Sequence, residues 1–465
     1  MKTIFTLIFK NILAPVVIVL SIYNGQLSAQ EYNVYYGNIH SHSSYSDGNQ
    51  DSTNYIPYDD YVYASQSHHF DFLGISDHNH MNTSANFYNG TLQADSFNLT
   101  HPNFVALYGM EWGYYSYGHV VIYESQALYG WSGSYDVYTD AYDYDSLFHK
   151  IVAKPGCFAY LAHPSTAHFG GLVSKPFDSI DDKAIIGMAY GATSAYSEDT
   201  TYSEWPGYYP GYFKKMLLRG YHPGAGIDHD NHKTNYGRNT QSRLAVLALY
   251  REKYHILDAL RNRRFFATED WNAVINFKIN LQPMGSIFTS AGVPHIEVYA
   301  SDGDGETASA ITLYYGIKGD TVNTYTYTTV YNTDTLTIDT DSIPDLSTHF
   351  YWVVVQQDDG DIITSSPIWY TRDDGQLVVG LDENSAPAQA QVFPNPASAY
   401  FTVSASSAIQ DIELYNITGI MLAKHNYSGN GFSASFPLTG ISNGICIARI
   451  RTTSGVFTKK IIVQK

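Results

Sequence analysis

Histidines are concentrated in the first half of the chain, at spacings suited to holding a metal ion. Of the eighteen histidines in the 465 residues, fifteen lie between positions 40 and 255. A single His-x-His pair is weak support for a metal site, because a chain with this many histidines contains such a pair by chance about as often as not. The pattern gains weight only where several histidine and carboxylate groups occupy comparable places in the fold.

The first groups follow stretches that are expected to be strands. His40 and His42 close one such stretch, and alternate residues of a strand point to the same side, so both imidazoles can bind one ion. Asp47 adds a carboxylate in the turn that follows. His78 comes three residues after Ile75, the expected end of a second strand, which is where βα barrels place their active sites. Two strand ends therefore carry ligand-type side chains.

Further groups stand in the same topological position. Glu111 follows a third expected strand, and His119 opens the next one. His163 closes another strand just before a proline, and Asp230 and His232 form an Asp-x-His pair. Five or six separate strand ends thus deliver histidines and carboxylates to one edge of the expected sheet.

Each group taken alone has a simpler explanation. His40 and His42 can be a surface-strand pair, His163 a core histidine with its hydrogen bonds satisfied, and Glu111 a helix cap or a solvated carboxylate. The pattern would be accidental only if all of these explanations were true at once, so we favour a metal site. Five other residues are expected to orient ligating imidazoles: Asp77, His80, His168, Asp228 and His229. Five histidines read as structural or surface residues: His68, His69, His101, His149 and His222.

The elements that must position these groups change character along the chain. From 30 to 282, apolar runs such as Phe70–Ile75, 104–108 and 157–162 alternate with helix-like stretches such as 143–153, the pattern of βα units around a parallel sheet or barrel. From 283 to 373, β-branched and tyrosine alternation predicts an all-β sandwich. Residues 374–390 read as a polar linker, and a last all-β domain spans 391–465.

Bulk properties limit the compartment and the partners. Residues 1–29 have the sequence of regions that is typical of a signal peptide, although Lys10 interrupts the apolar run. No later apolar run is long enough for a transmembrane segment. The net charge of −18 and the pI near 5.3 disfavour nucleic acid as a partner. Cys157 and Cys446 fall in different expected domains, so we expect no disulfide.

Taken in order, the motifs resemble the metal-site motifs of the polymerase-and-histidinol-phosphatase (PHP) superfamily. The matching pieces within about residues 33–270 are Gly37-Asn38-Ile39-His40-Ser41-His42 through Gly48, Ser76-Asp77-His78-Asn79, Glu111, Gly118-His119, Ala162-His163-Pro164 and Asp230-Asn231-His232. Glu111-Trp112, Gly118-His119-Val120 and the segments Ala259–Arg263 and Phe265–Thr268 look closest to the carbaryl-hydrolase-like branch.

The resemblance implies a distorted (β/α)7 barrel with two or three divalent ions. It implies that His40, His42, Glu111 and Asp230 hold one ion, that Glu111 bridges to a second ion held by His119 and His163, and that Asp47, His78 and His232 hold a third. Glu111 and Asp230 are then the candidate catalytic groups. The segment Asp228-His229-Asp230-Asn231-His232 leaves the ligand open between Asp228 and Asp230, and we favour Asp230 because it alone has a histidine two residues later.

Such a site implies hydrolysis by a metal-activated water. Mixed nitrogen and oxygen ligands suit zinc, manganese or iron. Phosphoester hydrolysis of a small-molecule substrate leads by family analogy, with carbamate or carboxylic ester hydrolysis as an alternative on the same site and a non-catalytic surface binding protein with structural metals as another. Arg238 and Arg243 are candidates for gripping a substrate anion, although either can be an ordinary surface arginine.

The last domain has its own resemblance. Val392–Ala397, Ile412–Gly419, Leu438–Ile445 and the terminal Lys459–Val463 resemble the type A C-terminal sorting domain of type IX secretion, with Cys446 where an aromatic or aliphatic residue is commoner. Without that resemblance the stretch reads as a generic β-sandwich. The resemblance implies the type IX secretion machinery as a partner and export through the periplasm and outer membrane, ending with release or attachment at the cell surface.

Overall fold

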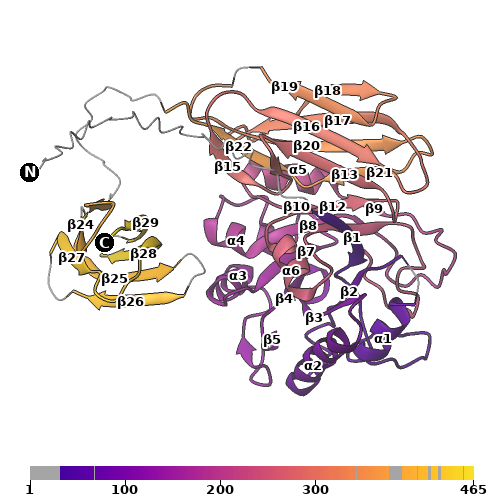
Figure 1. Cartoon of the computed structure of the whole chain (residues 1–465). Helices are drawn as coiled ribbons and strands as arrows, with labels where there is room; N and C mark the ends of the chain where they lie inside the picture. Colours follow the sequence, from indigo (N-terminus) through magenta and orange to yellow (C-terminus); the bar gives the residue numbers. More distant parts are fainter. Residues whose placement is uncertain are drawn as a thin grey trace, which may run out of the picture. The chain divides into compact units, whose positions relative to one another are not determined.

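The computed structural model describes residues 32–465 except 67–68, 342, 376–389, 406, 417–419, 428–430 and 454. The expected signal peptide and nearly all of the expected linker lie outside the described residues. The chain divides into two compact units between Gln376 and Leu377 (Figure 1). Each unit is described by itself.

The first unit combines large sheets with a few helices. The strands of its α/β part are β1 (Asn33–Asn38), β2 (Phe72–Ile75), β3 (Val105–Trp112), β4 (His119–Tyr123), β5 (Tyr129–Gly130), β6 (Val137–Tyr138), β7 (Phe158–Ala162), β8 (Ile185–Ala192), β9 (Gly207–Tyr208), β10 (Gly224–Asp228), β11 (Arg243–Ala248) and β12 (Phe265–Thr268). Its helices are α1 (Pro57–Ala64), α2 (Ser84–Thr100), α3 (Tyr144–Ala153), α4 (Ser179–Ala184), α5 (Pro210–Arg219) and α6 (Lys253–Arg261), with short 3-10 turns η1 (Tyr115–Tyr117) and η2 (Phe169–Gly171).

Strand direction explains why the motifs meet at one edge. The sheet runs β10-β8-β7-β4-β3-β2-β1, and every neighbouring pair is parallel except that β4 is antiparallel to both β3 and β7. The start of β4 therefore lies at the same edge as the ends of the other strands. Every residue of β3 and of β7 is buried, as expected for strands covered on both faces.

The mixed α/β class is confirmed, but the closed barrel is not. β1 uses both of its edges, pairing with β2 on one side and, antiparallel, with β11 on the other, so no edge is left for a ladder with β10. The segments that follow β1 and β10 meet at an isolated bridge between Ser41 and Asn231, beside which the amide of His42 donates to the carbonyl of Asn231 at 2.9 Å.

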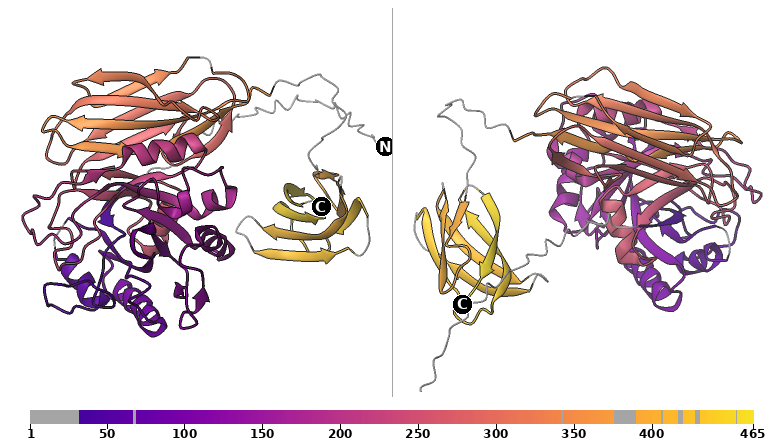
Figure 2. Two further views of the ribbon diagram at one scale, coloured as in Figure 1. Left: turned by 180° about the vertical axis from the view of Figure 1, so that it is seen from behind. Right: turned by 45° about the horizontal axis from the view of Figure 1, so that its top comes forward.

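The central β region is built into the first unit. It contains β13 (Val274–Ile279), β14 (Gln282–Pro283), β15 (Ile287–Ser290), β16 (His295–Ser301), β17 (Ala308–Ile317), β18 (Tyr325–Tyr331), β19 (Thr335–Asp339), β20 (Thr348–Gln357), β21 (Ile362–Ser365) and β22 (Ile368–Arg372). The main sheet passes from β12 through β21 to β20, β17 and β18, while β14-β13-β16-β19 form a second sheet (Figures 1 and 2).

Packing also joins the α/β and β parts. Phe213 of α5 lies with its ring 6.3 Å from that of Trp352 on β20, within one buried cluster. The expected boundary between 282 and 283 falls inside β14, and β13 already pairs with β16 before it. The all-β character is as expected, and its strands begin earlier than the expected boundary.

The second unit is an all-β sandwich. Its strands are β23 (Ala390–Phe393), β24 (Tyr400–Ala405), β25 (Ile409–Asn416), β26 (Met421–Asn426), β27 (Ser433–Pro437), β28 (Gly444–Thr452) and β29 (Gly455–Val463). Sheets β23-β24-β27 and β26-β25-β28-β29 enclose a core that contains Phe401, Phe436 and Cys446. Both cysteines are free thiols. Among the described residues, no helix combines the length and the apolarity needed to cross a lipid bilayer.

Candidate metal centre

All nine side chains expected to bind metal converge at the strand edge described above. Their nitrogen and oxygen atoms form three overlapping groups, in each of which the atoms lie within 4.8 Å of one another: His40, His42, Glu111 and Asp230; His42, Asp47, His78 and His232; and His78, Glu111 and His119. His163 lies beside these groups, with its Nε2 3.2 Å from Glu111 Oε1.

Glu111 is the centre of this cluster. Its fully buried carboxylate lies within 3.4 Å of five imidazole nitrogens. These are Nδ1 of His119 and of His78 at 2.7 Å each, Nε2 of His40 and of His163 at 3.2 Å each, and Nε2 of His42 at 3.4 Å. One carboxylate thus links every group of the cluster, as a bridging ligand does.

The local backbone brings Glu111 to this place in a way that the sequence interpretation missed. β3 continues to Trp112 because its last four residues pair with β4, so Glu111 lies inside the strand instead of after it. The chain that leaves β2 follows β3 closely, with the amide of Glu111 donating to the carbonyl of Asp77 at 3.1 Å. That contact places His78 beside Glu111 in an isolated parallel bridge.

The contacts between these side chains fit a cation better than direct hydrogen bonds. Nε2 of His40 and Nε2 of His119 are buried without a hydrogen-bond partner among the described residues. Buried polar atoms in proteins are nearly always hydrogen-bonded, so each such atom needs an explanation. Five imidazole nitrogens that face one carboxylate at 2.7–3.4 Å suit divalent ions held between them.

Electrostatics lead to the same conclusion. Burial alone raises the pKa of Glu111, but His119, His40 and His78 outweigh burial and hold that pKa well below its usual value. Burial lowers the pKa of His40, yet the Asp228, Glu111 and Asp230 carboxylates raise it well above normal. The carboxylates therefore require positive charge at this point, which protons or metal ions can supply.

The histidines near Asp47 form a further part of the cluster. Burial, His78 and His232 lower the pKa of His42 to about 3, so its ring is neutral and able to donate a lone pair to a metal. Asp47 Oδ1 lies 3.3 Å from Nε2 of His232 and 3.7 Å from Nε2 of His78. This group has the composition of a third ion site.

Asp228 and Asp230 occupy different places around His40. Oδ1 of Asp230 lies 3.0 Å from Nε2 of His42 and 3.2 Å from Nε2 of His40, on the side of Glu111. Oδ1 of Asp228 lies 2.6 Å from Nδ1 of His40, on the opposite side of the ring. The geometry thus favours Asp230 as the ligand and Asp228 as the group that orients His40.

Asp77 holds the first loop of the site in shape. Its buried carboxylate accepts hydrogen bonds from the amide and hydroxyl of Ser43, both at 2.7 Å, from Ser46 Oγ at 2.8 Å and from the Tyr108 hydroxyl at 2.9 Å. These four bonds fix the loop that follows β1, so Asp77 supports His42 without joining the cluster.

Two site residues have strained backbones. His163 has φ 25° and Asp230 has φ 51°, in the left-handed region that costs a non-glycine residue on the order of 1–3 kcal/mol. Gly118, directly before His119, has φ 106° and lies so close to His168 that an added Cβ would be 2.7 Å from that side chain. Strain of this kind clusters at functional sites, where surrounding contacts maintain it.

The two candidate arginines do not behave alike. Arg243 is fully buried and donates to the carbonyls of His69, Gly237, Thr240 and Ser242, so the expectation that it grips a substrate is wrong. Its position at the start of β11 turns the side chain inward, where it caps a loop. Arg238 donates to the carbonyl of Thr200 at 3.2 Å and stays a candidate only.

Most of the other histidines have contacts within the protein. Such contacts were expected for His69, His101, His149 and His222, whereas His168 and His229 were expected to orient ligating imidazoles. The ring of His101 stacks on Phe97 at 3.9 Å, His222 Nδ1 lies 2.7 Å from Asp182, and His69 stacks on Trp271 at 3.8 Å. His149 Nδ1 lies 2.7 Å from the carbonyl of Asp145, His229 Nε2 2.9 Å from that of Ser242, and His168 Nδ1 accepts from the amide of Ser165 at 3.1 Å. His68 lies outside the described residues.

Aromatic side chains next to the cluster were not expected. The ring of Tyr196 lies 4.5 Å from that of His232, and 55 % of Tyr196 is exposed. His80 lies between His78, at 5.0 Å, and Trp131, at 6.3 Å. No sequence signal distinguishes Tyr196 in a chain with 42 tyrosines. Tyr196 is therefore an exposed aromatic ring beside the cluster.

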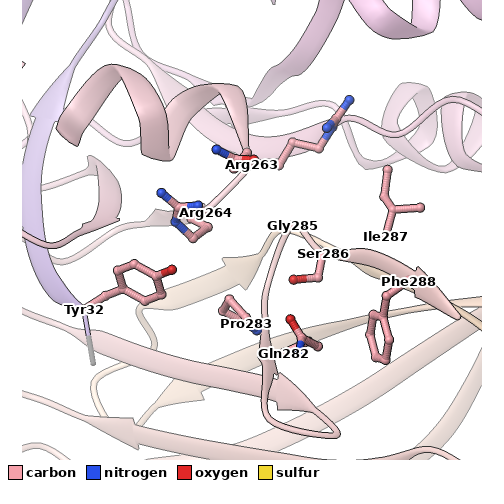
Figure 3. Close-up of a pocket in the computed structure, with 10 residues that line it drawn as sticks. Tyr32, Arg263, Arg264, Gln282, Pro283, Gly285, Ser286, Ile287 and Phe288 are labelled. Atoms are coloured by element: carbon pink, nitrogen blue, oxygen red, sulfur yellow. The ribbon is translucent and has the colours of Figure 1, made fainter. Parts of the chain in front are cut away.

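A separate pocket of about 380 Å³ lies elsewhere in the first unit (Figure 3). Arg263, Arg264, Gln282 and Ser286 are among its lining residues, and none of the nine cluster residues is. Arg264 Nη2 donates to Asp258 at 2.5 Å and Arg263 Nε to the carbonyl of His222 at 2.5 Å. With these groups occupied, the pocket offers no catalytic set.

Comparison with known proteins identifies the second unit. Residues 391–464 match the family described as the secretion system C-terminal sorting domain. The second unit is a type IX sorting domain. The chain is therefore exported by type IX secretion to the outer membrane, the cell surface or the extracellular space, and the expected partnership with the secretion machinery holds.

The remaining comparisons are distant. No curated protein matches the chain. A Bacteroides vulgatus structure described as a two-domain protein containing a predicted PHP-like metal-dependent phosphoesterase shares 13% identity over 88% of this chain and 98% of that one, with a TM-score of 0.36. Fibronectin(III)-like modules of Clostridium thermocellum CbhA share 15% identity over 41% of this chain and 94% of theirs, with a TM-score of 0.20. Scores this low do not decide what the cluster does.

Proposed function

We propose that the first unit is an exported PHP-type hydrolase, with a distorted (β/α)7 barrel, that uses two or three divalent ions to hydrolyse phosphoesters. The observation that carries this proposal is the buried Glu111 carboxylate surrounded by five imidazole nitrogens. In the proposed assignment His40, His42 and Asp230 share one ion with Glu111, His119 and His163 share a second with it, and Asp47, His78 and His232 hold the third.

Bound divalent ions supply a water activated near neutral pH and a positive field on the attacked ester. The protein's part is to fix the donor atoms. Asp228 holds the His40 ring by its Nδ1, and Asp77 fixes the loop that carries His42. Glu111 and Asp230 are ionised at neutral pH, so their oxygens are free to bind the ions and their negative charges balance the positive charge of the ions. The site needs no side-chain nucleophile.

Carbamate or carboxylic ester hydrolysis on the same site is the second candidate. The rings of Tyr196 and Trp131 lie beside the histidine cluster and suit a flat aromatic leaving group. Arg243, which a phosphate-binding role would have used, is buried away from substrate. The choice between the two ester classes is therefore an experimental one.

The test is an assay of the chain stripped with a chelator and reloaded with Mn²⁺, Zn²⁺ or Fe²⁺. Aryl phosphomonoesters, bis-aryl phosphodiesters, aryl acetates and aryl carbamates are offered at equal concentration. The proposal expects metal-dependent turnover of a phosphoester above the other classes. Faster turnover of a carbamate or carboxylic ester would favour the second candidate, and turnover of none would indicate a binding protein with structural metals.

We also expect catalysis to need only the first unit. Asp374 accepts from the amide of Gly292 at 2.8 Å and from Arg372 Nε at 2.9 Å, so a chain ending after Asp374 keeps these contacts. Its kcat/KM should stay within about twofold of the full chain, while delivery to the cell surface should be lost. Loss of catalysis in a folded truncated chain would mean that the second unit helps to build the site.

A further inference from the structure

A second group of ligand-type atoms lies in the first unit, and it consists only of oxygen donors. Carboxylate oxygens of Asp270, Asp302 and Glu306 lie within 4.8 Å of one another. Asp270 follows β12 of the α/β part, whereas Asp302 and Glu306 lie in the connection between β16 and β17. None of these residues belongs to the histidine cluster, so the group is a distinct feature.

This group lacks the positive charge that balances the histidine cluster. Asp270 is only 7 % exposed, and the ion pairs of the described residues include none between these three carboxylates and a lysine or arginine. Arg243 acts on Asp270 through its field, but its N–H groups donate to backbone carbonyls. Burying carboxylates together without a counter-charge is costly.

Gln357, at the end of β20, points independently to a missing partner. It is 4 % exposed, and its side-chain amide lies against two of the carboxylates, with Nε2 at 3.2 Å from Asp302 Oδ2 and 3.4 Å from Glu306 Oε2. Its Oε1 is buried and has no hydrogen-bond partner among the described residues. A buried amide oxygen normally accepts a hydrogen bond or binds a cation.

The distances suit one ion in particular. Ca²⁺ binds carboxylate and amide oxygens at about 2.3–2.6 Å, so its adjacent ligands lie roughly 3.4 Å apart and its opposite ligands roughly 5 Å apart. The amide of Gln357 lies at the first spacing from two carboxylates, and exchanging its nitrogen and oxygen would turn Oε1 toward both of them. The absence of nitrogen and sulfur donors from this group disfavours zinc.

We propose that Asp270, Asp302, Glu306 and the Gln357 amide oxygen bind a Ca²⁺ ion that braces the junction between the α/β part and the β part of the first unit. One ion then ties the end of β12 to the β16–β17 connection and to β20. Export makes this reasonable, because extracellular modules bind Ca²⁺ with Kd values on the order of 10⁻⁴–10⁻³ M.

Without an ion, two of the carboxylates need a proton instead. Burial and the facing carboxylate of Asp302 raise the pKa of Asp270 to about 8. A shared proton between Asp270 and Asp302 is thus the alternative to Ca²⁺. The two explanations differ in whether added Ca²⁺ stabilises the protein through these residues.

The test is thermal unfolding of the full chain at pH 8, with 5 mM Ca²⁺ or with a Ca²⁺ chelator, together with a count of bound Ca²⁺ by calorimetric titration. We expect Ca²⁺ to raise the Tm of the first unit by about 2–4 °C. Asp302→Asn should lose this rise and one bound Ca²⁺ per chain. In chelator the same variant should be at least as stable as the wild type, because repulsion with Asp270 is relieved.

Asp341→Asn is the matched control, because Asp341 is an exposed aspartate in the connection after β19. It should keep the full Ca²⁺-dependent rise. Each variant is compared with itself, with and without Ca²⁺, so loss of stability alone does not obscure the result. Should Asp302→Asn fail to fold, Glu306→Gln, at a half-buried position, gives the same comparison. No rise in the wild type, or an equal rise in the Asp302 or Glu306 variant, would overturn the proposal.

Discussion

The histidine cluster and the oxygen-only group are two solutions to one problem, which is how to bury several carboxylates in a chain with a net charge of −18. Around Glu111, imidazoles supply nitrogen donors and hold the pKa of the carboxylate low. Asp270, Asp302 and Glu306 form a group that contains no imidazole, and the pKa of Asp270 rises to about 8. The first set suits transition metals and the second suits Ca²⁺.

The difference teaches that ligand chemistry separates catalysis from bracing within one unit. In the proposed function the nitrogen donors would bind ions that activate water, with strained residues such as His163 among the ligands. In the further proposal, oxygen donors from separate strands would bind a hard ion that joins those strands. Each variant that disables one set should therefore leave the other intact.

The largest expected effect comes from Glu111→Gln. Removing the charge of the carboxylate that links all groups should lower kcat/KM at least about a thousandfold, because the bridged pair of ions loses its shared ligand. Metal content and steady-state kinetics measure this loss. The Ca²⁺-dependent rise in Tm should be unchanged. Exposed Glu252, changed to Gln, is the matched control and should keep full activity. Wild-type activity in Glu111→Gln would remove Glu111 from the bridging role.

Substitutions of Asp230 and Asp228 should differ in how strongly they reduce kcat/KM. Asp230→Asn removes a ligand that faces both His40 and His42, so kcat/KM should fall by roughly a thousandfold. Asp228→Asn weakens only the orientation of His40, and partners of that kind are typically worth about 10–100-fold in metal affinity or activity. Metal titration of both variants with activity as a second readout makes the comparison. The reverse order of effects would exchange the two roles.

The sequence patterns predicted the residues of the candidate site more completely than they predicted the architecture. The nine residues from His40 to His232 converge because each motif lies at or near the end of a strand that reaches this edge, a relation that period-two patterns reveal. Strand pairing is not visible in that way. Nothing in residues 33–38 shows that β1 takes β11 as its second neighbour, which leaves the expected barrel without its closing ladder.

The roles of some individual side chains could not be predicted from the sequence for a related reason. Arg243 stands just past the last motif, but whether a residue at the start of a strand points to the site or to the interior depends on register, which the pairing of β11 with β1 and β12 sets. Asp270, Asp302 and Gln357 are far apart in the chain and form no motif. Their meeting depends on the continuation of the sheet from β12 into β21 and β20, a tertiary feature.

The smallest expected effect is a pH dependence confined to the oxygen-only group. Burial and Asp302 raise the pKa of Asp270 to about 8 from an ordinary value near 4. Glu306 and Asp361 add negative charge nearby. Burial and Asp359 raise the pKa of Asp361 to about 7. A carboxyl whose folded pKa is raised loses its stabilising proton as pH increases. Without Ca²⁺, the first unit should therefore lose stability between about pH 4 and pH 8, and the field of Arg243 on Asp270 offsets part of this loss.

Ca²⁺ competes with that proton, so its stabilising effect should be small at pH 5 and should grow by about 2–3 °C in Tm toward pH 8. Unfolding scans at several pH values in chelator and in 5 mM Ca²⁺ measure the difference, with Asp270→Asn removing the pH dependence and Asp341→Asn retaining it. A Ca²⁺ effect that stays constant from pH 5 to pH 8 would show that Asp270 does not exchange a proton for the ion.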